Sequence, residues 1–246
     1  MEIVVAGDYL ELSREAARRI AKTVLLNPSS VIALPTGETP KGLYHLLSAW
    51  AREGITDLSH AVLFNLDEYL GIPPDHPQSF RRYMEEHLLR HVRVGTHHIP
   101  DATARDPEAE CRRYEGLISA HGGIDLAVLG LGPNGHIAFN EPGTPFESAT
   151  HVVTLSRETR LREAPRFGGV EEVPEKAITM GIRTIMNARE LLLLASGEEK
   201  AVAVQQALRG PVTPEVPASV LQLHPRLTVI LDRKASRYLD DLAVSA

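Results

Sequence analysis

Residues 130–142 bring the side chains best suited to chemistry into one short run. The run reads Gly-Leu-Gly-Pro-Asn-Gly-His-Ile-Ala-Phe-Asn-Glu-Pro and follows the apolar stretch 124–129. Its glycines let the backbone take positive φ and approach a ligand closely, and His136 can titrate near neutral pH. With Glu141 nearby, His136 suits proton transfer over a pocket. The alternative is a hydrogen-bonded structural histidine in a glycine turn that ends a strand.

A second run follows the apolar residues 31–34. It reads Pro-Thr-Gly-Glu-Thr-Pro-Lys-Gly and extends from Pro35 to Gly42. Backbone amides, the hydroxyls of Thr36 and Thr39, and the N-terminus of a following helix can bind a phosphate. The spacing is not that of the Gly-x-x-x-x-Gly-Lys-Ser/Thr loop, which disfavours nucleoside triphosphates. An ordinary strand-to-helix turn is the competing interpretation.

Two adjacent carboxylates follow the run Val62-Leu-Phe-Asn. They are Asp67 and Glu68, with Tyr69 directly after them. A partly buried carboxylate among apolar neighbours has a raised pKa, which suits removal of a proton next to a carbonyl or imine. The sequence therefore offers a general base at this strand end. Adjacent acids are also common on solvated turns, and that interpretation stays open here.

Two basic residues are candidates for holding an anion. Arg166 lies in a segment rich in Pro, Gly, Arg and Glu, from which it can close over a phosphate bidentately. Lys200 comes near the start of an expected helix, where the helix dipole disfavours a lysine that has no other role. For each residue alone, a solvated surface charge is the competing interpretation.

Strand-like and helical patterns alternate along the chain, as in α/β proteins. Strands are expected at 3–6, 30–34, 61–65, 126–129, 191–195 and 228–231, and helices at about 10–25, 41–52, 79–91, 107–120, 198–209 and 233–239. This alternation predicts a modified doubly wound α/β fold, with a mostly parallel sheet and helices on both faces. Because ligands of such sheets sit beyond the carboxyl ends of the strands, the turns above should share one pocket. The stretch of about 142–176 is the candidate for a mobile flap, or lid.

The composition limits the classes of function. A chain of 246 residues, 43% hydrophobic and 24% charged, suits a single α/β domain over 1–246. Its formal charge of −6 argues against a nucleic-acid partner, and no run reaches the ~20 apolar residues of a membrane span. Cys111, the only cysteine, excludes an intramolecular disulfide and a cysteine metal cluster, and its surroundings look helical. Because no signal-peptide pattern opens the sequence, we expect a cytoplasmic protein.

Taken together, these motifs resemble those of the glucosamine-6-phosphate deaminases. The matching motifs are Leu34-Pro-Thr-Gly-x-Thr-Pro, Asn65-Leu-Asp-Glu-Tyr, His76-Pro-Gln-Ser-Phe, the run 130–142 and Leu221-Gln-Leu-His-Pro. The resemblance runs nearly end to end. It implies conversion of glucosamine 6-phosphate and water into fructose 6-phosphate and ammonia, as in amino-sugar breakdown. It also implies a phosphosugar as the only ligand, with no metal or organic cofactor, and it leaves assembly into a homo-oligomer open.

The resemblance assigns a role to each matching residue. Asp67 would be the base that moves a proton between C2 and C1, and His136 would assist the opening of the sugar ring. Glu141 would orient and tune His136, and Asn134 would complete this relay. The phosphate would bind to Thr36, Gly37, Glu38, Thr39, Arg166 and Lys200.

Two positions depart from the family's pattern. Some members carry aspartate where this chain has Asn134, so the relay here is less anionic and depends more on Glu141. Hexameric members that are activated by N-acetylglucosamine 6-phosphate carry an arginine and a lysine at the positions of His151 and Val153. The resemblance therefore predicts that this allosteric site is absent.

Three other functions stay open at this point. The 6-phosphogluconolactonases share the Gly-His turn but continue it with a Thr-Ala-Ser-Leu-Phe-Pro type of run, whereas here Ile137-Ala-Phe-Asn-Glu-Pro follows the histidine. A sugar-phosphate sensor without turnover would keep the phosphate loop, but Asp67, His136 and Glu141 argue against it. Deamination of a related aminosugar phosphate is the third, because pocket shape decides which sugar stereochemistry is accepted.

Overall fold

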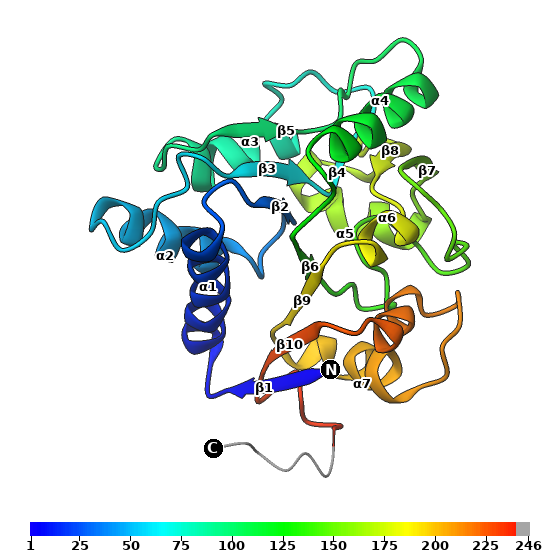
Figure 1. The fold of residues 1–246 in the computed structure, drawn as a ribbon. Coiled ribbons are helices and arrows are strands. Elements are labelled where there is room, and N and C mark those ends of the chain that lie inside the picture. Colours follow the sequence, from blue (N-terminus) through cyan, green and yellow to red (C-terminus); the bar gives the residue numbers. More distant parts are fainter. Residues whose placement is uncertain (240–246) are drawn as a thin grey trace.

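A parallel sheet runs through the middle of the molecule (Figure 1). The structure is a computed structural model that describes residues 1–239, so the end of the predicted domain, residues 240–246, lies outside the described residues. The strand order is β1-β10-β9-β6-β2-β3-β5, and every neighbouring pair is parallel. The strands are β1 (Glu2–Ala6), β2 (Val31–Leu34), β3 (Val62–Asn65), β5 (Thr96–His98), β6 (Leu126–Gly130), β9 (Glu190–Ala195) and β10 (Leu227–Asp232).

Helices cover both faces of this sheet, because successive strand residues point to opposite faces. In β6, Leu126 and Val128 belong to one buried cluster, and Ala127 and Leu129 belong to another. The two helix sets flank the sheet in Figure 1, which confirms the predicted α/β fold. The first set is α1 (Tyr9–Leu26) and α2 (Lys41–Arg52), and the second is α4 (Pro107–Ala120), α6 (Ile182–Met186) and α7 (Ala201–Arg209). None of the described helices is long and apolar enough to span a membrane.

The strand order reverses between β2 and β6. From β2, the sheet adds β3 and β5 on one side, and β6, β9 and β10 on the other. At such a point the connections leaving two neighbouring strands run to opposite faces, which opens a crevice at the carboxyl ends of the strands. The loop that contains residues 36–39 leaves β2 there, and the turn that contains His136 leaves β6.

A second, smaller sheet is antiparallel and was not predicted. Its order is β4 (Asp67–Tyr69), β8 (Lys176–Thr179) and β7 (His151–Thr154). Leu66 alone separates β3 from β4. Its N–H donates to the carbonyl oxygen of Leu34 (3.2 Å), and its own carbonyl oxygen accepts from the N–H of Met180 (2.7 Å). Asp67 therefore starts where the chain leaves one sheet for the other.

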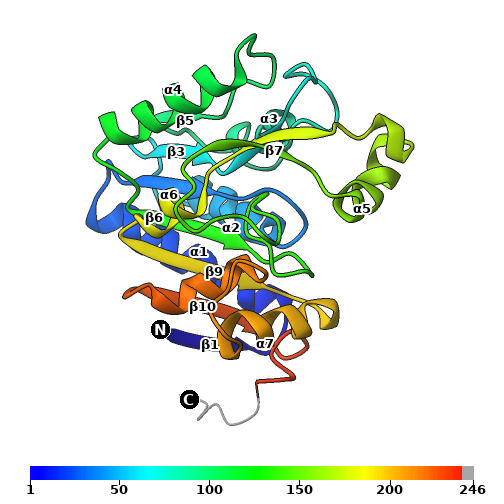
Figure 2. The ribbon, with the colours of Figure 1, turned by 90° about the vertical axis from the view of Figure 1, so that its right-hand side faces the viewer.

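The predicted lid segment, 142–176, contains β7, the helix α5 (Arg157–Phe167) and a 3-10 turn (Val170–Glu172). Figure 2 shows α5 standing away from the layered body of the molecule. Ser156 caps the helix by accepting from the N–H of Thr159 (3.1 Å), and Gly168 ends it with φ +87°. Thr159 is the only fully buried residue of α5, and the apolar contact of the helix is made at its end, where Phe167 packs on the ring of Tyr69 (centroids 5.3 Å apart).

The remaining helical segments differ from the prediction in four places. The expected helix over 79–91 is divided into α3 (Phe80–Met84) and a π turn (Glu85–Leu89). The expected helix over 233–239 is wrong, because residues 233–238 form turns in which the Asp232 carboxylate accepts from the N–H of Ala235 (2.7 Å). The predicted segment 198–209 begins as a 3-10 turn (Glu198–Lys200) and continues as α7, and a further 3-10 helix spans Pro217–Leu223.

Cys111 lies on α4, as predicted, with its side chain buried. Burial raises the pKa of its thiol to about 12. The thiolate is the reactive form of cysteine, so this side chain is inert near neutral pH.

Candidate active site

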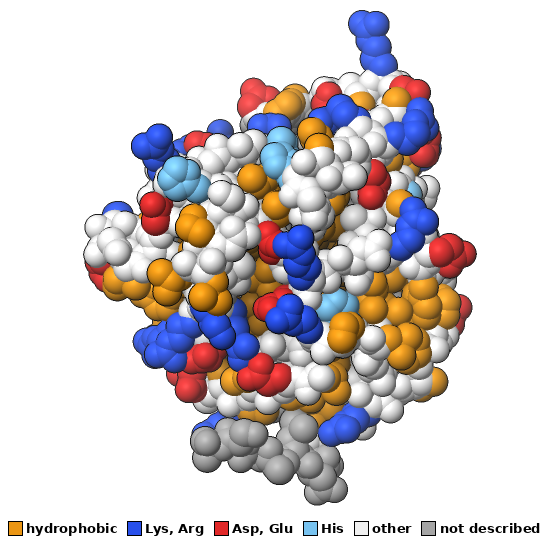
Figure 3. Space-filling model, viewed as in Figure 1, with side chains coloured by type: hydrophobic (Ala, Val, Ile, Leu, Met, Phe, Trp, Pro, Cys, Tyr) orange, Lys and Arg blue, Asp and Glu red, His pale blue; other side chains and the backbone are white. Residues whose placement is uncertain are grey.

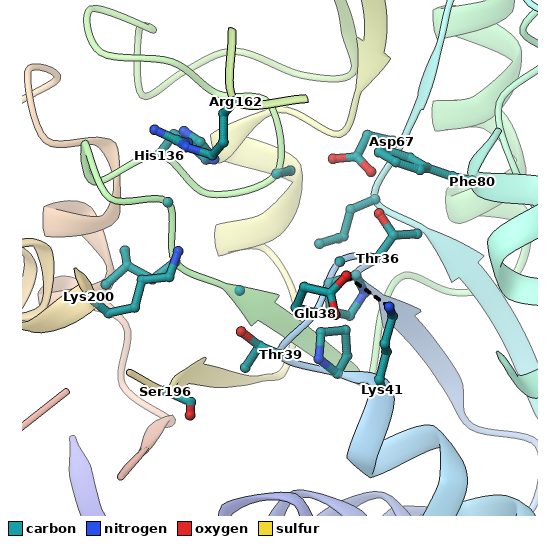
Figure 4. Close-up of a pocket in the computed structure, with 18 of the residues that line it drawn as sticks. Thr36, Glu38, Thr39, Lys41, Asp67, Phe80, His136, Arg162, Ser196 and Lys200 are labelled. Carbon is teal, nitrogen blue, oxygen red and sulfur yellow. Dashed lines mark hydrogen bonds and ion pairs between the residues drawn. The ribbon is translucent and has the colours of Figure 1, made fainter. Parts of the chain in front are cut away.

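A cavity of about 800 Å³ opens at the carboxyl ends of the central strands, where the strand order reverses. Figure 4 shows Asp67 on one side of it and His136 on the other, with the loop of residues 36–39 between them and below. Turns that lie far apart in the sequence thus form one pocket. The predicted site residues that line it are Thr36, Gly37, Glu38, Thr39, Asp67, His136, Arg166 and Lys200.

The loop after β2 has the properties of an anion site. Gly37 adopts φ +106°, a conformation that favours glycine, and Tyr83 Oη donates to its carbonyl oxygen (2.5 Å). The loop leads into the N-terminus of α2, where the helix dipole places partial positive charge. Lys41 Nζ donates to Glu38 Oε1 (2.8 Å), and this bond is the main reason that the pKa of Glu38 is lowered. Glu38 is therefore ionised at neutral pH, next to the expected phosphate position.

Asp67 presents a carboxylate to the cavity from a buried position, with 5% of the residue exposed. Burial, and then the neighbouring Glu68 carboxylate, raise its pKa well above the usual range of an aspartate. A raised pKa makes the ionised form a stronger base. Asp67 therefore suits the removal of a proton from a carbon next to a carbonyl or imine.

The adjacent Glu68 has a different task. Its carboxylate accepts from the backbone N–H groups of Tyr69, Phe80 and Arg81, each at 2.9 Å. Two of these donors belong to the first turn of α3, so Glu68 fastens that helix to β4. Burial raises the pKa of Glu68 against the opposing effect of the three donors. Of the two adjacent acids, one faces the cavity and the other holds the structure behind it.

His136 packs flat on the glycine-rich turn. Any side chain at Gly132 would collide with the imidazole, so only glycine leaves room for the ring. Burial lowers the pKa of His136 to about 4, with Glu141 opposing this shift and with Arg162 and Lys200 adding to it. The imidazole is therefore neutral near pH 7. Nδ1 is buried and has no hydrogen-bond partner within residues 1–239, which leaves Nε2 as the nitrogen for a ligand.

A polar network around Glu141 lies behind His136. Glu141 Oε2 is 3.9 Å from His136 Nδ1 and accepts from Asn134 Nδ2 (3.1 Å). Asn134 Oδ1 in turn accepts from the backbone N–H of His136 (3.2 Å). Glu141 Oε1 accepts from Ser156 Oγ (3.2 Å) and Thr159 Oγ1 (2.5 Å), at the start of α5. Asn134 and Glu141 thus stand outside the cavity lining, in a position to orient the imidazole.

The two predicted basic residues reach the cavity from different elements. Arg166 belongs to the last turn of α5, and its Nη2 donates to Glu38 Oε1 (2.6 Å), which links α5 to the loop after β2. Lys200 directly precedes α7, and burial is the main cause that lowers the pKa of its ammonium group. Neither side chain is therefore a plain surface charge, because Arg166 pairs with Glu38 and the ammonium group of Lys200 is largely buried.

The sequence patterns missed Arg162, which lines the cavity close to His136 (Figure 4). Arg162 and Arg166 are four residues apart on α5 and so share one helix face. If a helix over 157–167 had been predicted, the position of Arg162 one turn before Arg166 would have identified it as a second candidate. Lys41 was also missed as a site residue, although it belongs to the run of residues that the phosphate argument used.

The cavity lining combines four cationic side chains with four carboxylates, those of Glu38, Asp67, Glu163 and Glu199. Acidic and basic side chains are interspersed over the face of the molecule that Figure 3 shows, and neither sign dominates that face. The chain as a whole carries −6. The cationic residues that line the cavity are Lys41, Arg162, Arg166 and Lys200.

A pocket at a strand-order reversal places the molecule among the doubly wound α/β proteins that bind small ligands. The convergence of cationic side chains and a helix N-terminus on that pocket selects, within this class, proteins with anionic ligands. The chain belongs to the family of glucosamine-6-phosphate isomerases and 6-phosphogluconolactonases, whose model matches residues 9–230. The resemblance noted in the motifs is thereby confirmed at the level of the family.

Individual relatives are similar over nearly their whole length. The glucosamine-6-phosphate deaminase of Lachnoclostridium phytofermentans is 50% identical, over 94% of this chain and 98% of the relative. A solved structure of a monomeric glucosamine-6-phosphate deaminase has a TM-score of 0.93 and 44% identity, covering 96% of this chain and 99% of that one. The 6-phosphogluconolactonase of Trypanosoma cruzi, at 24% identity and a TM-score of 0.75 over 98% and 97% of the two chains, shares the fold.

Proposed function

We propose that the chain is a glucosamine-6-phosphate deaminase, which converts glucosamine 6-phosphate and water into fructose 6-phosphate and ammonia. The observation that carries this proposal is the buried Asp67 carboxylate, which faces His136 across a cavity that Arg166 and Lys200 also line. The deaminases that match this chain at 50% and 44% identity support the same activity.

The substrate's phosphate binds at the loop after β2 in this proposal. Backbone amides of Gly37, Glu38 and Thr39 and the hydroxyls of Thr36 and Thr39 supply hydrogen bonds, and Arg166 and Lys200 supply positive charge. A phosphate fixed at this end directs C1 and C2 of the sugar toward the space between Asp67 and His136. Binding energy from the phosphate thus positions the distant reacting carbons.

The ring opens with the help of His136. Its Nε2 accepts the proton of the C1 hydroxyl and returns it to the ring oxygen as the bond from C1 to that oxygen breaks, which leaves an aldehyde at C1. The imidazole carries a positive charge only between these two transfers. The Glu141 carboxylate, 3.9 Å from Nδ1, stabilises that charge.

Asp67 then moves the carbon-bound proton. Its carboxylate removes the proton from C2 while the aldehyde oxygen gains one, which gives an enolamine. Return of the proton to C1 gives an iminium group at C2. Water adds to C2, and ammonia leaves, which produces the ketone of fructose 6-phosphate. One carboxylate serves both carbons because C1 and C2 are adjacent.

We further infer that residues 142–176 act as a lid over this site, within a single α/β domain, and that the enzyme works in the cytoplasm. Light scattering decides whether copies form a homo-oligomer. His151 and Val153 lie on β7 without the cationic pair of the activated family members. Added N-acetylglucosamine 6-phosphate is therefore expected to leave the saturation curve unchanged.

The proposal is tested by incubating the purified protein with glucosamine 6-phosphate and measuring ammonia and fructose 6-phosphate. 6-Phosphogluconolactone, and other aminosugar phosphates, serve as parallel substrates. We expect equal amounts of both products from glucosamine 6-phosphate. Rapid lactone hydrolysis without ammonia would show a lactonase, and tight substrate binding without any product would show a sensor.

A further inference from the structure

We propose that Ser156 and Thr159, at the start of α5, are positioning residues that fix the Glu141 carboxylate and thereby select the tautomer of His136. The catalytic consequence of this inference rests on the proposed function, whereas the tautomer itself does not. Because both hydroxyls belong to the start of the lid helix α5, the geometry of the proton relay would depend on the position of that helix.

The two oxygens of Glu141 face different parts of the molecule. Within residues 1–239, Oε1 accepts only from the hydroxyls of Thr159 (2.5 Å) and Ser156 (3.2 Å), and the Ser156 hydroxyl also lies 3.0 Å from Thr159 Oγ1. Oε2 accepts from Asn134 Nδ2 (3.1 Å) and is the oxygen that lies 3.9 Å from His136 Nδ1. A carboxylate held at both oxygens cannot rotate freely. The hydroxyls on Oε1 therefore keep Oε2 directed at the imidazole.

The charge that lies next to Nδ1 favours one tautomer of the imidazole. Glu141, on the same turn, places negative charge next to Nδ1. The cations that act on the ring come from other elements, Arg162 from α5 and Lys200 from the residue before α7. A carboxylate beside Nδ1 favours the proton on that nitrogen, which leaves Nε2 with its lone pair. That is the form able to accept the C1 hydroxyl proton.

The same contact seats the lid helix. Thr159 is the one buried residue of α5, and its hydroxyl donates to the Glu141 carboxylate rather than to a backbone carbonyl of the helix. Arg162 and Arg166, which reach the cavity, lie further along the same helix. Any displacement of α5 from this seat removes both donors from Oε1. Relay geometry and substrate binding thus depend on the same helix.

The matched variants are Thr159→Val, which removes the hydroxyl with little change of shape, and Thr159→Ser, which keeps it. Thr144→Val is the control, because Thr144 Oγ1 donates to the main-chain oxygen of Glu141 (2.7 Å) and not to its carboxylate. Ser156→Ala combined with Thr159→Val removes both donors. Circular dichroism verifies that each variant is folded.

The first readout is the pair of imidazole ¹⁵N shifts of His136 in the ligand-free protein, which report the tautomer directly. We expect Nδ1–H to dominate in the unaltered protein, in Thr159→Ser and in Thr144→Val. The ratio of Nδ1–H to Nε2–H should fall in Thr159→Val and fall further in the double variant. An unchanged ratio in both variants, or a dominant Nε2–H form in the unaltered protein, overturns the inference.

The second readout is the split between kcat and KM. Loss of a supporting hydrogen bond behind a functional histidine typically costs about 10- to 100-fold in activity. We expect this loss in the kcat of Thr159→Val, with KM nearly constant and with recovery in Thr159→Ser. A rise of KM alone would assign Thr159 to binding and overturn its positioning role. If no form of the protein released ammonia, the proposed function would fail while the ¹⁵N shifts still decided the tautomer.

Discussion

The two walls of the cavity are held in contrasting ways. The wall that carries Asp67 is built into both sheets, since Leu66 bonds to β2 on one side and to Met180 after β8 on the other. The opposite cover is α5, which has one buried residue and stands away from the body of the molecule (Figure 2). One wall is fixed by strand pairing, and the other is held by a few polar side chains and by the packing of Phe167 on Tyr69.

The contrast suggests a division of work between the walls. Proton transfer needs a base within a narrow range of distances, which a strand end supplies better than a surface helix. Recognition of a phosphate tolerates more movement, because a long arginine side chain can follow its ligand. Asp67 on the sheet wall and Arg166 on the helix wall should therefore respond differently to substitution.

The largest effect is expected at Asp67. The change Asp67→Asn keeps the shape but removes the base, so kcat should fall about 100- to 10,000-fold while KM stays nearly constant. Exchange of the C1 and C2 protons with deuterated solvent should stop. The measurements are ammonia release and NMR of the sugar in D₂O. Continued exchange would remove Asp67 as the base and break the assignment of chemistry to this wall.

The neighbouring acid is the matched control for that change. In Glu68→Gln, an amide nitrogen replaces one of the oxygens that accept backbone N–H groups. A buried donor without a partner costs about 1–3 kcal/mol, so Tm should fall while kcat changes far less than in Asp67→Asn. A loss of kcat as large as that of Asp67→Asn would mean that the two carboxylates act together.

The pH dependence of both activity and stability follows from the raised pKa of Asp67. Because the base must be ionised, kcat should decline as pH falls through a value above the ordinary ~3.9 of an aspartate. Stability depends on pH in the opposite direction. Because the pKa of Asp67 is higher in the folded state than in the unfolded state, Asp67 contributes to the free energy of unfolding at acid pH, and this contribution is lost as pH rises through the folded-state pKa. Asp67→Asn should therefore raise Tm at pH 8 and change it little at pH 4. A Tm gain that shrinks with rising pH would contradict the raised pKa.

A smaller effect, on binding, is expected at Arg166, near the end of the helix wall opposite to Thr159. In the proposed binding mode, Arg166→Ala removes a charge-assisted hydrogen bond to the phosphate, typically about 1.5–3 kcal/mol, so KM should rise about 10- to 100-fold with kcat less affected. Arg189→Ala is the control, because Arg189 pairs with Asp125 away from the cavity lining. Steady-state kinetics over a wide substrate range separates the two constants. A large fall of kcat at constant KM would show that Arg166 acts in the chemical steps, and would contradict its assignment to substrate binding.

The smallest effect is expected where the walls meet. Glu38 Oε1 pairs with both Arg166 (2.6 Å) and Lys41 (2.8 Å), so its carboxylate competes with a phosphate for the same cations. Glu38 is exposed, and exposed pairs contribute about 0–1 kcal/mol, so Glu38→Gln should lower KM by no more than about fivefold. The gain should vanish at high ionic strength. A raised KM would show that the carboxylate helps to hold the loop and Arg166 in place for binding.

The sheet wall was largely predictable from the sequence. The central strands are short apolar runs, and polar turn residues follow each of them, so the pattern gave both the strands and the positions of the site turns. The helices α2 and α4 have the predicted bounds, because each buries a periodic apolar face. The parallel fold then implied that these turns share one edge of the sheet.

The helix wall was not predictable in the same way. With only Thr159 buried, α5 lacks the periodic apolar stripe that indicates a helix, and Pro165 lies within it. The three-residue strand β4 is too short to give a pattern. The predicted helix over 233–239 is wrong although Asp232 accepts from the N–H of Ala235 as an N-cap would, because residues 233–238 continue only as turns. Arg162 and the hydroxyls of Ser156 and Thr159 were therefore missed along with the helix that carries them.

The buried thiol of Cys111 has a practical consequence for observing this helix. Because the thiol of Cys111 is protonated and buried, maleimide reagents should not react with it. A cysteine introduced on the outer side of α5 would therefore be the only position that is labelled. Leu161, 52% exposed, is a suitable position. A fluorophore attached there would report directly, in solution and during turnover, whether the helix opens and closes with each catalytic cycle.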